Sequence, residues 1–243
     1  MIKFENVTKT YNKTVKAIDN MSLEVKGGEI VGFIGPNGSG KTTTMKLLTG
    51  IIKADSGKIT VNGYDIRKEP IKAKQSIGYI ADSPDMFLRL KGTEFLSLMG
   101  DIYHVPLEQR KKIISDLSEK FGLTDVLSSP IMSYSHGMRQ KIMVVAALMH
   151  NPPVWILDEP MTGLDPKSSY ELKNMMREHA KAGNAVFFST HVLEVAEKLC
   201  DRVIIIKNGH ILYEGTLDTL ESKYENKSLE EIFLELTENE TVS

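Results

Sequence analysis

Gly35-Pro36-Asn37-Gly38-Ser39-Gly40-Lys41-Thr42 is the stretch that decides the fold, because it matches the pattern G-x-x-x-x-G-K-[ST] in full. The apolar run 30–34 before it indicates a strand, and 42–48 after it indicates a helix that Gly50 stops. Glycines let successive backbone N–H groups turn toward one anion, and the helix N-terminus adds positive potential. The sequence therefore predicts a phosphate-binding loop between a strand and a helix.

The last two residues of this loop have separate predicted roles. The Lys41 ammonium group is expected to reach the β- and γ-phosphates of a nucleoside triphosphate, and the Thr42 hydroxyl is expected to ligate Mg²⁺. The glycine spacing differs from G-x-G-x-x-G, which disfavours a dinucleotide site.

A carboxylate pair follows a second buried strand, at 154–157. Because Mg²⁺ and an attacking water both need carboxylates, Asp158 is predicted to hold the metal, directly or through water, and Glu159 to act as general base. His191 follows another predicted strand, 186–189, at the sheet edge where ligands collect in such folds. We therefore expect a catalytic role for His191 as well as for Lys41 and Glu159.

The order of elements predicts an α/β chain. Residues 2–25 alternate as short strands, whereas the later strands are continuous apolar runs, which suit a mainly parallel sheet covered on both faces. The expected fold is a P-loop NTPase (RecA-like) core with a mainly parallel sheet, an N-terminal antiparallel β subdomain and an inserted α-helical subdomain. The further strands expected are at 59–61, 77–81, 203–206 and 210–213.

Three parts are expected within one domain of residues 1–243. Residues 1–83 with 151–215 form the core and β subdomain, and 84–150 form the helical subdomain. Residues 216–243 form an acidic tail, in which Leu229, Ile232, Phe233 and Leu236 follow helical spacing and predict a docked amphipathic helix.

Composition narrows the class of protein. The chain has 243 residues, 41% hydrophobic and 26% charged, with a formal net charge of −2. This excludes a disordered chain and a strongly basic nucleic-acid binder. Cys200 is the single cysteine, so an internal disulfide or thiolate cluster is excluded. The longest uncharged stretch, 142–157, is shorter than the ~20 apolar residues of a membrane span. Contact with a membrane is therefore expected only through a partner chain.

Together these motifs resemble the ATP-binding-cassette (ABC) ATPase family over about residues 2–236. Lys41 and Thr42 match its Walker A motif, and Asp158 and Glu159 match Walker B. Further matches are Tyr11 (adenine stacking), 134–140 (signature), Gly163-Leu164-Asp165 (D-loop) and His191 (switch histidine). The resemblance implies the cofactors ATP and Mg²⁺. It also implies a nucleotide-binding set made of Tyr11, Gly35, Pro36, Asn37, Gly38, Ser39, Gly40, Lys41, Thr42 and Thr43.

The resemblance also implies a mechanism. Two copies pair head to tail, and ATP lies between the Walker A motif of one and the signature of the other. The signature residues implied to contact that ATP are Ser135, His136, Gly137 and Met138, with Asp165 in the D-loop. Hydrolysis removes the bridging phosphate and the pair separates.

Two positions depart from the family pattern. His136 replaces the first signature glycine, and Asp82 stands where the family usually has a glutamine. Asp82 remains a candidate ligand for Mg²⁺ or water, so the expected metal set is Thr42, Asp158 and Asp82. Both departures bear on turnover and coupling rather than on nucleotide binding.

The function expected is the ATPase subunit of a membrane transporter, at the cytoplasmic face of the membrane. Separate transmembrane permease chains are expected to dock on residues 84–104, and nucleic acid is not expected as a partner. The 138–140 and 228–236 segments are most similar to ABC-2 type exporters, which favours export over import. A homodimer and a heterodimer of ATPase chains both stay open, and cargo specificity is expected to lie in the permease.

Three alternative functions are open besides that of a transporter ATPase. A soluble ABC-type ATPase acting on ribosomes or DNA usually has two cassettes or a long coiled-coil insert, which are not evident here. A P-loop small-molecule kinase needs an acceptor, so phosphate release without one distinguishes it. A weakly hydrolysing, regulatory ATP-binding chain is allowed by His136 and Asp82, but Glu159 and His191 argue against it.

Overall fold

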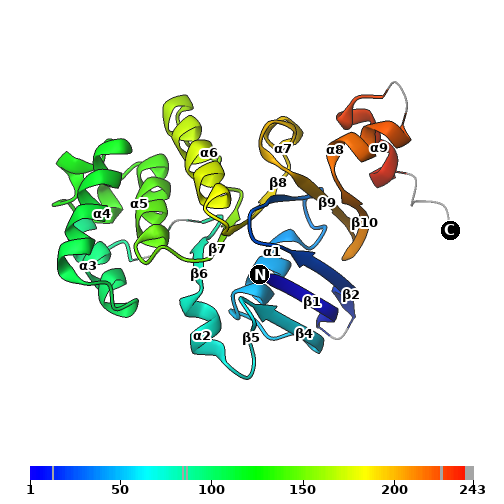
Figure 1. Cartoon of the computed structure of the whole chain (residues 1–243), viewed down its shortest axis with the longest axis horizontal. Coiled ribbons are helices and arrows are strands. Elements are labelled where there is room, and N and C mark those ends of the chain that lie inside the picture. The colour runs from blue at the N-terminus through cyan, green and yellow to red at the C-terminus, as the bar shows by residue number, and fades with distance from the viewer. Residues whose placement is uncertain (13, 84, 86, 225–226, 239–243) are drawn as a thin grey trace.

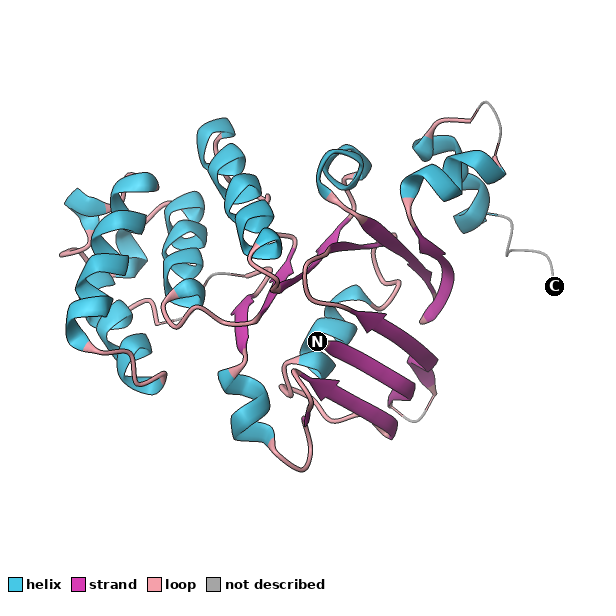
Figure 2. Cartoon of the chain, viewed as in Figure 1, coloured by secondary structure: helices cyan, strands magenta, loops and turns pink. Residues whose placement is uncertain are grey.

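A six-stranded sheet in the order β10-β9-β3-β8-β7-β6 forms the centre of the molecule (Figures 1 and 2). The computed structural model describes residues 1–243 except 13, 84, 86, 225–226 and 239–243. Neighbouring strands run parallel from β9 through to β6, and β10 is antiparallel to β9. The strands are β3 (Ile30–Ile34), β6 (Ile77–Ile80), β7 (Val154–Asp158), β8 (Ala185–Thr190), β9 (Arg202–Lys207) and β10 (His210–Gly215).

Both faces of this sheet are covered, as the apolar runs predict. On one face, Phe33, Ile156 and Phe187 pack with α1 (Lys41–Leu48) and with a second sheet. On the other face, Trp155 and Phe188 pack with the helical part of the chain. The predicted mainly parallel sheet is therefore confirmed.

The second sheet is antiparallel and comes from the N-terminal part of the chain, as predicted. Its order is β2-β1-β4-β5, with β1 (Ile2–Tyr11), β2 (Val15–Val25), β4 (Ser56–Val61) and β5 (Tyr64–Asp65). β1 and β2 are longer than the short strands expected. Asn6 and Asn20 have left-handed backbones (φ 51° and 49°), and the β1–β2 register shifts along the pair. Such irregularities break the alternation that sequence periodicity can detect.

A group of helices lies to one side of the sheets, at the left of Figure 1. It contains α3 (Gly92–Ile102), α4 (Leu107–Lys120) and α5 (His136–Leu148), with short 3₁₀ turns η1 (Thr124–Val126) and η2 (Ile131–Ser133). Residues 84 and 86 of the expected helical subdomain lie outside the described residues. The short helix α2 (Pro70–Gln75), which leads into β6, was not expected from the sequence.

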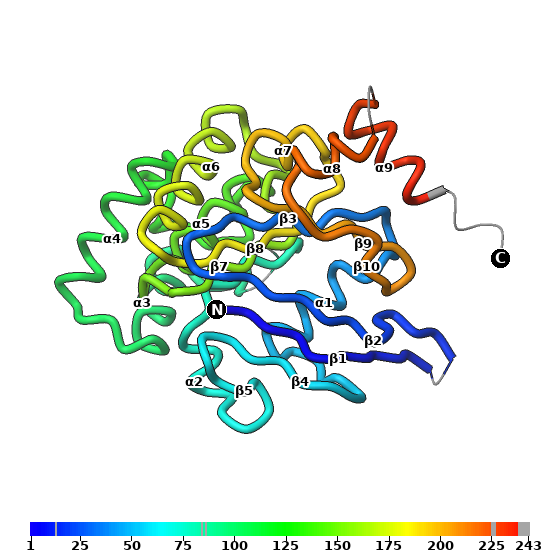
Figure 3. Tube along the Cα trace, turned by 45° about the vertical axis from the view of Figure 1, so that its right-hand side comes forward, coloured from blue at the N-terminus to red at the C-terminus, as the bar shows by residue number. Residues whose placement is uncertain are grey.

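The remaining helices cover the sheet and its β10 end. They are α6 (Pro166–Lys181), α7 (Leu193–Leu199), α8 (Leu217–Lys223) and α9 (Leu229–Glu238). In α9, Leu229 and Ile232 are buried in a cluster with Val203 and Ile205 of β9, and Figure 3 shows α8 and α9 beside this end of the sheet. The helix expected in the acidic tail therefore docks through its apolar face. Residues 225–226 and 239–243 of the tail lie outside the described residues.

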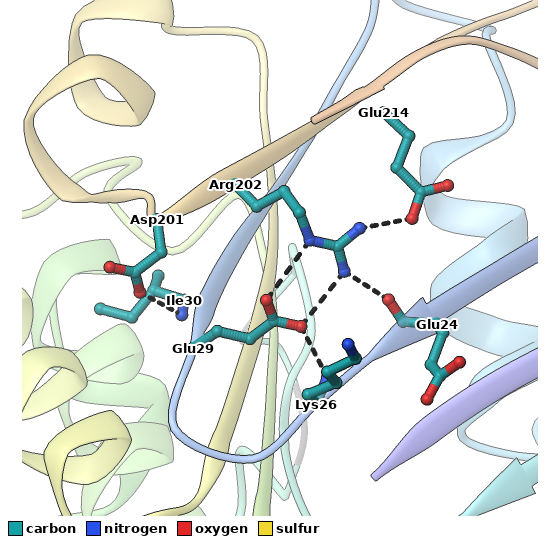
Figure 4. A network of polar contacts seen from close by, with 7 residues as sticks. All are labelled: Glu24, Lys26, Glu29, Ile30, Asp201, Arg202 and Glu214. Carbon is teal, nitrogen blue, oxygen red and sulfur yellow. Dashed lines mark hydrogen bonds and ion pairs between the residues drawn. The ribbon is translucent and has the colours of Figure 1, made fainter. Parts of the chain in front are cut away.

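A polar network fixes the outer strands to the turn before β3 (Figure 4). Arg202 on β9 forms ion pairs with Glu29 (3.1 Å) and Glu214 and donates a hydrogen bond to the Glu24 carbonyl. The neighbouring Asp201 accepts a hydrogen bond from the Ile30 N–H at 2.8 Å. These contacts hold the start of β3, and so the loop that follows it, in place. Among the described residues, no helix combines the length and apolar character needed to cross a bilayer.

Candidate functional site

The loop between β3 and α1 depends on two glycines that have no room for a side chain. A Cβ at Gly35 would lie 2.4 Å from the Ile206 carbonyl oxygen, and one at Gly40 would lie 2.7 Å from that of Ala17. Gly40 also has a φ of 113°, which L side chains rarely adopt. The first turn of α1 has no side-chain cap and no acidic residue. Its N–H groups and positive end are therefore free to bind an anion.

A pocket of about 350 Å³ opens over this loop. Residues predicted from four separate sequence motifs meet in it, namely Lys41 with Thr42, Asp82, Glu159 and His191. Tyr11 ends β1, is 38% exposed, and is not one of the described residues that line this pocket. The other lining residues are Ala17, Asn37, Gly38, Gly40, Thr43 and Thr162.

The Lys41 side chain is buried and turned back onto its own loop. Its Nζ donates hydrogen bonds to the carbonyl oxygens of Gly35 (2.7 Å) and Pro36 (3.2 Å). The same Nζ lies 3.8 Å from Oε1 of Glu159. Burial lowers the pKa of Lys41, and the charges of Glu159, Asp158 and Asp82 oppose that shift. A ligand with negative charge would stabilise the protonated form of Lys41, because it would compensate the buried ammonium group.

Asp158 ends β7 as a buried carboxylate with one free oxygen. Its Oδ1 accepts a hydrogen bond from the Ser189 hydroxyl, whereas Oδ2 is buried without a hydrogen-bond partner. Burial raises the pKa of Asp158, the hydrogen bond from Ser189 opposes this shift, and the charges of Asp82 and Glu159 raise the pKa further. A cation at Oδ2 would stabilise the ionised form. Oxygen donors such as these suit a hard divalent cation.

The described residues contain no group of three or more His, Cys, Asp or Glu side chains that could hold a metal by themselves. A cation beside Asp158 and Thr42 would therefore need further oxygen ligands from outside the protein. Phosphate oxygens and water are the usual source for Mg²⁺.

Glu159 is held in position by its neighbours in the adjacent strand and loop. It has a left-handed backbone (φ 48°), and its N–H donates to the Ser189 hydroxyl at 3.0 Å. The Nδ1 of His191 lies 3.0 Å from Oε2 of Glu159. The Ser189 hydroxyl thus contacts the Asp158 carboxylate and the Glu159 backbone, a role that the sequence analysis missed. The only sequence signal for it is its position, two residues before His191 at the end of a strand.

The 134–140 stretch forms a second helix N-terminus away from this pocket. Ser135 caps α5, since its Oγ accepts the Met138 N–H at 3.3 Å. A Cβ at Gly137 would lie 2.5 Å from the Gly163 carbonyl oxygen, and one at Gly163 would lie 2.4 Å from Cδ2 of His136. The start of α5 therefore packs on the loop that precedes Asp165. None of 135–138 is among the described residues that line the Lys41 pocket.

Asp165 connects α6 to α5. It caps α6 by accepting the Ser168 N–H at 2.9 Å, and its Oδ2 lies 2.7 Å from Nζ of Lys141. Hydrogen bonds from Lys141 and then Ser168 hold the pKa of Asp165 well below its usual range. Lys141 was not singled out in the sequence, because only the fold brings it to Asp165.

The loop after β3 and the carboxylates at the end of β7 define a P-loop nucleoside triphosphatase. The model of the family described as "ABC transporter" matches residues 18–162, and the chain belongs to that family. It is accordingly the ATP-binding, ATP-hydrolysing subunit of an ABC transporter.

Relatives and solved structures agree with this assignment. The chain is 37% identical over 223 residues to the linearmycin resistance ATP-binding protein LnrL of Bacillus subtilis (strain 168), covering 92% of this chain and 71% of that protein. A solved ATP-binding subunit of an ABC transporter has a TM-score of 0.92 and 32% identity, covering 97% and 99% of the two chains. The dimeric, post-hydrolysis ATP-binding cassette MJ0796 with ADP and Pi has a TM-score of 0.81 and 26% identity, covering 89% and 99%.

Proposed function

We propose that this chain uses Mg²⁺-dependent ATP hydrolysis to power export through separate membrane permease chains. The observation that carries the proposal is the convergence of Lys41, Glu159 and His191 in one pocket while the second helix N-terminus, at Ser135, lies outside it. One phosphate site is thus assembled within the chain, and a second anion-binding element is left for a nucleotide held elsewhere.

Within the pocket, each side chain has one task. Lys41 leaves the Gly35 carbonyl and binds the β- and γ-phosphates, which also compensates its buried charge. Glu159 accepts a proton from the attacking water, and His191 holds the Glu159 carboxylate in orientation. Thr42 and Asp158 are the proposed ligands of Mg²⁺, and Asp82 lines the same pocket as Thr42. The metal supplies charge neutralisation at the phosphate oxygens.

The proposed partner of the signature is a second ATPase chain. The backbone N–H groups at the start of α5, with Ser135, His136, Gly137 and Met138, would contact the γ-phosphate held by Lys41 of the opposite copy. The dimeric state of the MJ0796 neighbour supports this arrangement. Tyr11, exposed at the end of β1, is the proposed stacking residue for adenine. Both a homodimer and a heterodimer satisfy the proposal.

The proposed permease contact is an apolar pocket of about 190 Å³ at the border of the helical group. Phe87, 42% exposed, packs against Phe95 of α3 in a tilted pair with ring centroids 5.3 Å apart. The other lining residues are Tyr79, Ala81, Ser83, Met99, Tyr103, Met143, Ala146 and Ala147. We refer to residues 85–91 as the dock segment; residue 86 lies outside the described residues. The resistance role in the name of LnrL supports export, and the permease would place the chain at the cytoplasmic face of the membrane.

The three parts have matching proposed roles. Residues 1–83 with 151–215 bind and hydrolyse ATP, and residues 84–150 carry the signature and the permease contact. In the part 216–243, α8 and α9 cover the β10 end of the sheet.

Phosphate release from ATP, without any acceptor molecule, tests the hydrolytic part of the proposal. The purified chain should release phosphate only with Mg²⁺, and Lys41→Ala should lose about 10²-fold or more of the rate, on the scale of one removed charge-stabilising donor. Lys46→Ala, in the last turn of the same helix, is the matched control and should keep the rate. Normal hydrolysis by Lys41→Ala would contradict the site assignment.

Co-purification from detergent-solubilised membranes tests the permease contact. With a tagged chain and the permease co-expressed, Phe87→Ala should lower recovery of the permease because an aromatic anchor is removed. Leu107→Ala is the control, since Leu107 is exposed at the start of α4, beyond residues 84–104, and is not among the described residues that line the pocket. If both variants recover the same amount of permease, the permease does not bind at the Phe87 pocket.

A further inference from the structure

The dock segment is bonded directly to the residues that precede the signature. The Met132 N–H donates to the Leu88 carbonyl at 2.8 Å, and the Ile131 N–H donates to the Leu90 carbonyl at 2.9 Å. Lys91 and Pro130 form an antiparallel bridge next to them. A shift of the dock segment would therefore also move residues 131–132, which lead into α5, or break these hydrogen bonds.

Arg139, in the first turns of α5, joins the same two segments by its side chain. Its Nη1 lies 2.6 Å from Oδ1 of Asp85 in the dock segment, and its Nη2 donates to the Met132 carbonyl at 2.9 Å. Its side chain is 21% exposed and that of Asp85 is 53% exposed. The Arg139 guanidinium group on α5 thus contacts both the dock segment and the chain before the signature.

The opposite side of α5 is tied to the hydrolysis site. Lys141 is two residues beyond Arg139, which on an α-helix places it about 200° around the axis. It is paired with Asp165 at 2.7 Å, and the His136–Gly163 contact lies at the helix start. Movement of α5 at Arg139 is therefore passed to the loop 163–165, which follows Glu159 by only a few residues.

We propose that Arg139 is a positioning residue that transmits movement of the dock segment to α5 and, through Lys141, to Asp165. The route runs through the Arg139–Asp85 ion pair, separately from Asp82. The inference rests on the proposed function, because the force on the dock segment comes from a permease chain. Since the pair is partly exposed, its expected contribution is modest, about two- to fivefold in the measured coupling.

Stimulation of ATP hydrolysis by the reconstituted permease is the quantity to measure. Asp85→Asn should lower the ratio of the rate with permease to the rate without it by about two- to fivefold. Asp85→Arg and Arg139→Asp should each lower it at least as much, because each leaves two like charges facing one another. The double variant Asp85→Arg/Arg139→Asp restores an ion pair and should recover stimulation, which a loss of packing alone would not do.

A matched control is Glu108→Gln on α4, which removes an exposed ion pair with Lys111 and should leave stimulation unchanged. The inference is overturned if the permease stimulates wild type and Asp85→Asn equally, or if the double variant does not recover stimulation. Either result leaves the proposed function intact. A wild-type chain that no permease stimulates contradicts the proposed function.

Hydrogen exchange of the purified chain adds a readout that needs no permease. Asp85→Asn should raise amide exchange in the first turns of α5 by about two- to fivefold, since one of its side-chain tethers is lost. Glu108→Gln should not. Unchanged exchange in Asp85→Asn contradicts the role of Arg139 independently of any transport assay.

Discussion

The Nζ of Lys41 lies 3.8 Å from Oε1 of Glu159, so the cation proposed for the phosphates and the carboxylate proposed for the water face each other across the pocket. Glu159 in turn holds His191 at 3.0 Å. The three side chains therefore form one continuous row of polar contacts. In the proposed function, phosphate binding would draw Lys41 away and leave the Glu159 carboxylate free to accept a proton.

Asp158→Asn tests the proposed metal contact. Asparagine can still accept the Ser189 hydrogen bond, but it removes the charge at the unpartnered Oδ2. The half-saturating Mg²⁺ concentration for hydrolysis should rise by about 10- to 100-fold. Because a buried charge whose pKa is raised is also removed, the nucleotide-free variant should melt at a higher temperature.

Asp125→Asn, in η1, is the control for the metal titration. If Asp158→Asn has the same Mg²⁺ dependence as wild type, Asp158 does not bind the metal.

His136→Gly tests the first departure from the family signature. The imidazole packs on Gly163 and lies outside the Lys41 pocket. We expect the hydrolysis rate to change and the affinity for ATP, measured by calorimetry, to stay within about twofold, because the phosphate loop is untouched. An affinity loss of tenfold or more would place His136 in the nucleotide site of its own chain.

His150 makes stability depend on pH. Its ring stacks on Tyr103, with centroids 3.6 Å apart and planes 4° apart, and burial lowers its pKa to about 4. The unfolded chain binds a proton near pH 6.5, so between these values it holds more protons than the folded chain, and stability falls as pH falls. From pH 7 to pH 5 the free energy of unfolding should drop by about 2 kcal/mol on account of His150.

His150→Phe keeps a stacked ring and should lose this part of the pH dependence in denaturant melts. His179 is buried with a lowered pKa and adds a dependence of the same sign to both proteins, so it cancels in the comparison. His210→Gln, at an exposed position, should behave as wild type. Identical slopes for wild type and His150→Phe would show that His150 does not titrate in this window.

The sequence was sufficient for those parts of the site that local pattern and sheet topology determine. The glycine pattern identifies the loop, and parallel strands carry Asp158 and His191 to one edge, where Asp158 pairs in register with Ser189. The apolar runs also identify the sheet as covered on both faces.

Contacts between distant segments could not be predicted from the sequence. Lys141 meets Asp165 over 24 residues, and Arg139 meets Asp85 over 54. No periodicity encodes such pairs, because each is created by a loop residue that packs against α5. The left-handed backbone at Asn6 and the polar helix α2 were missed because they lack a repeating apolar pattern.

In the proposed function, ATP joins two chains, and they separate when Glu159 promotes hydrolysis of that ATP. Glu159→Gln should keep ATP binding and slow hydrolysis by about 10²-fold or more. Its mass should be measured by light scattering after gel filtration, with the permease absent and present. A dimer with Mg²⁺ and ATP, and a monomer with ADP or no nucleotide, is the predicted result. A monomer under saturating Mg²⁺ and ATP in both settings would contradict the account.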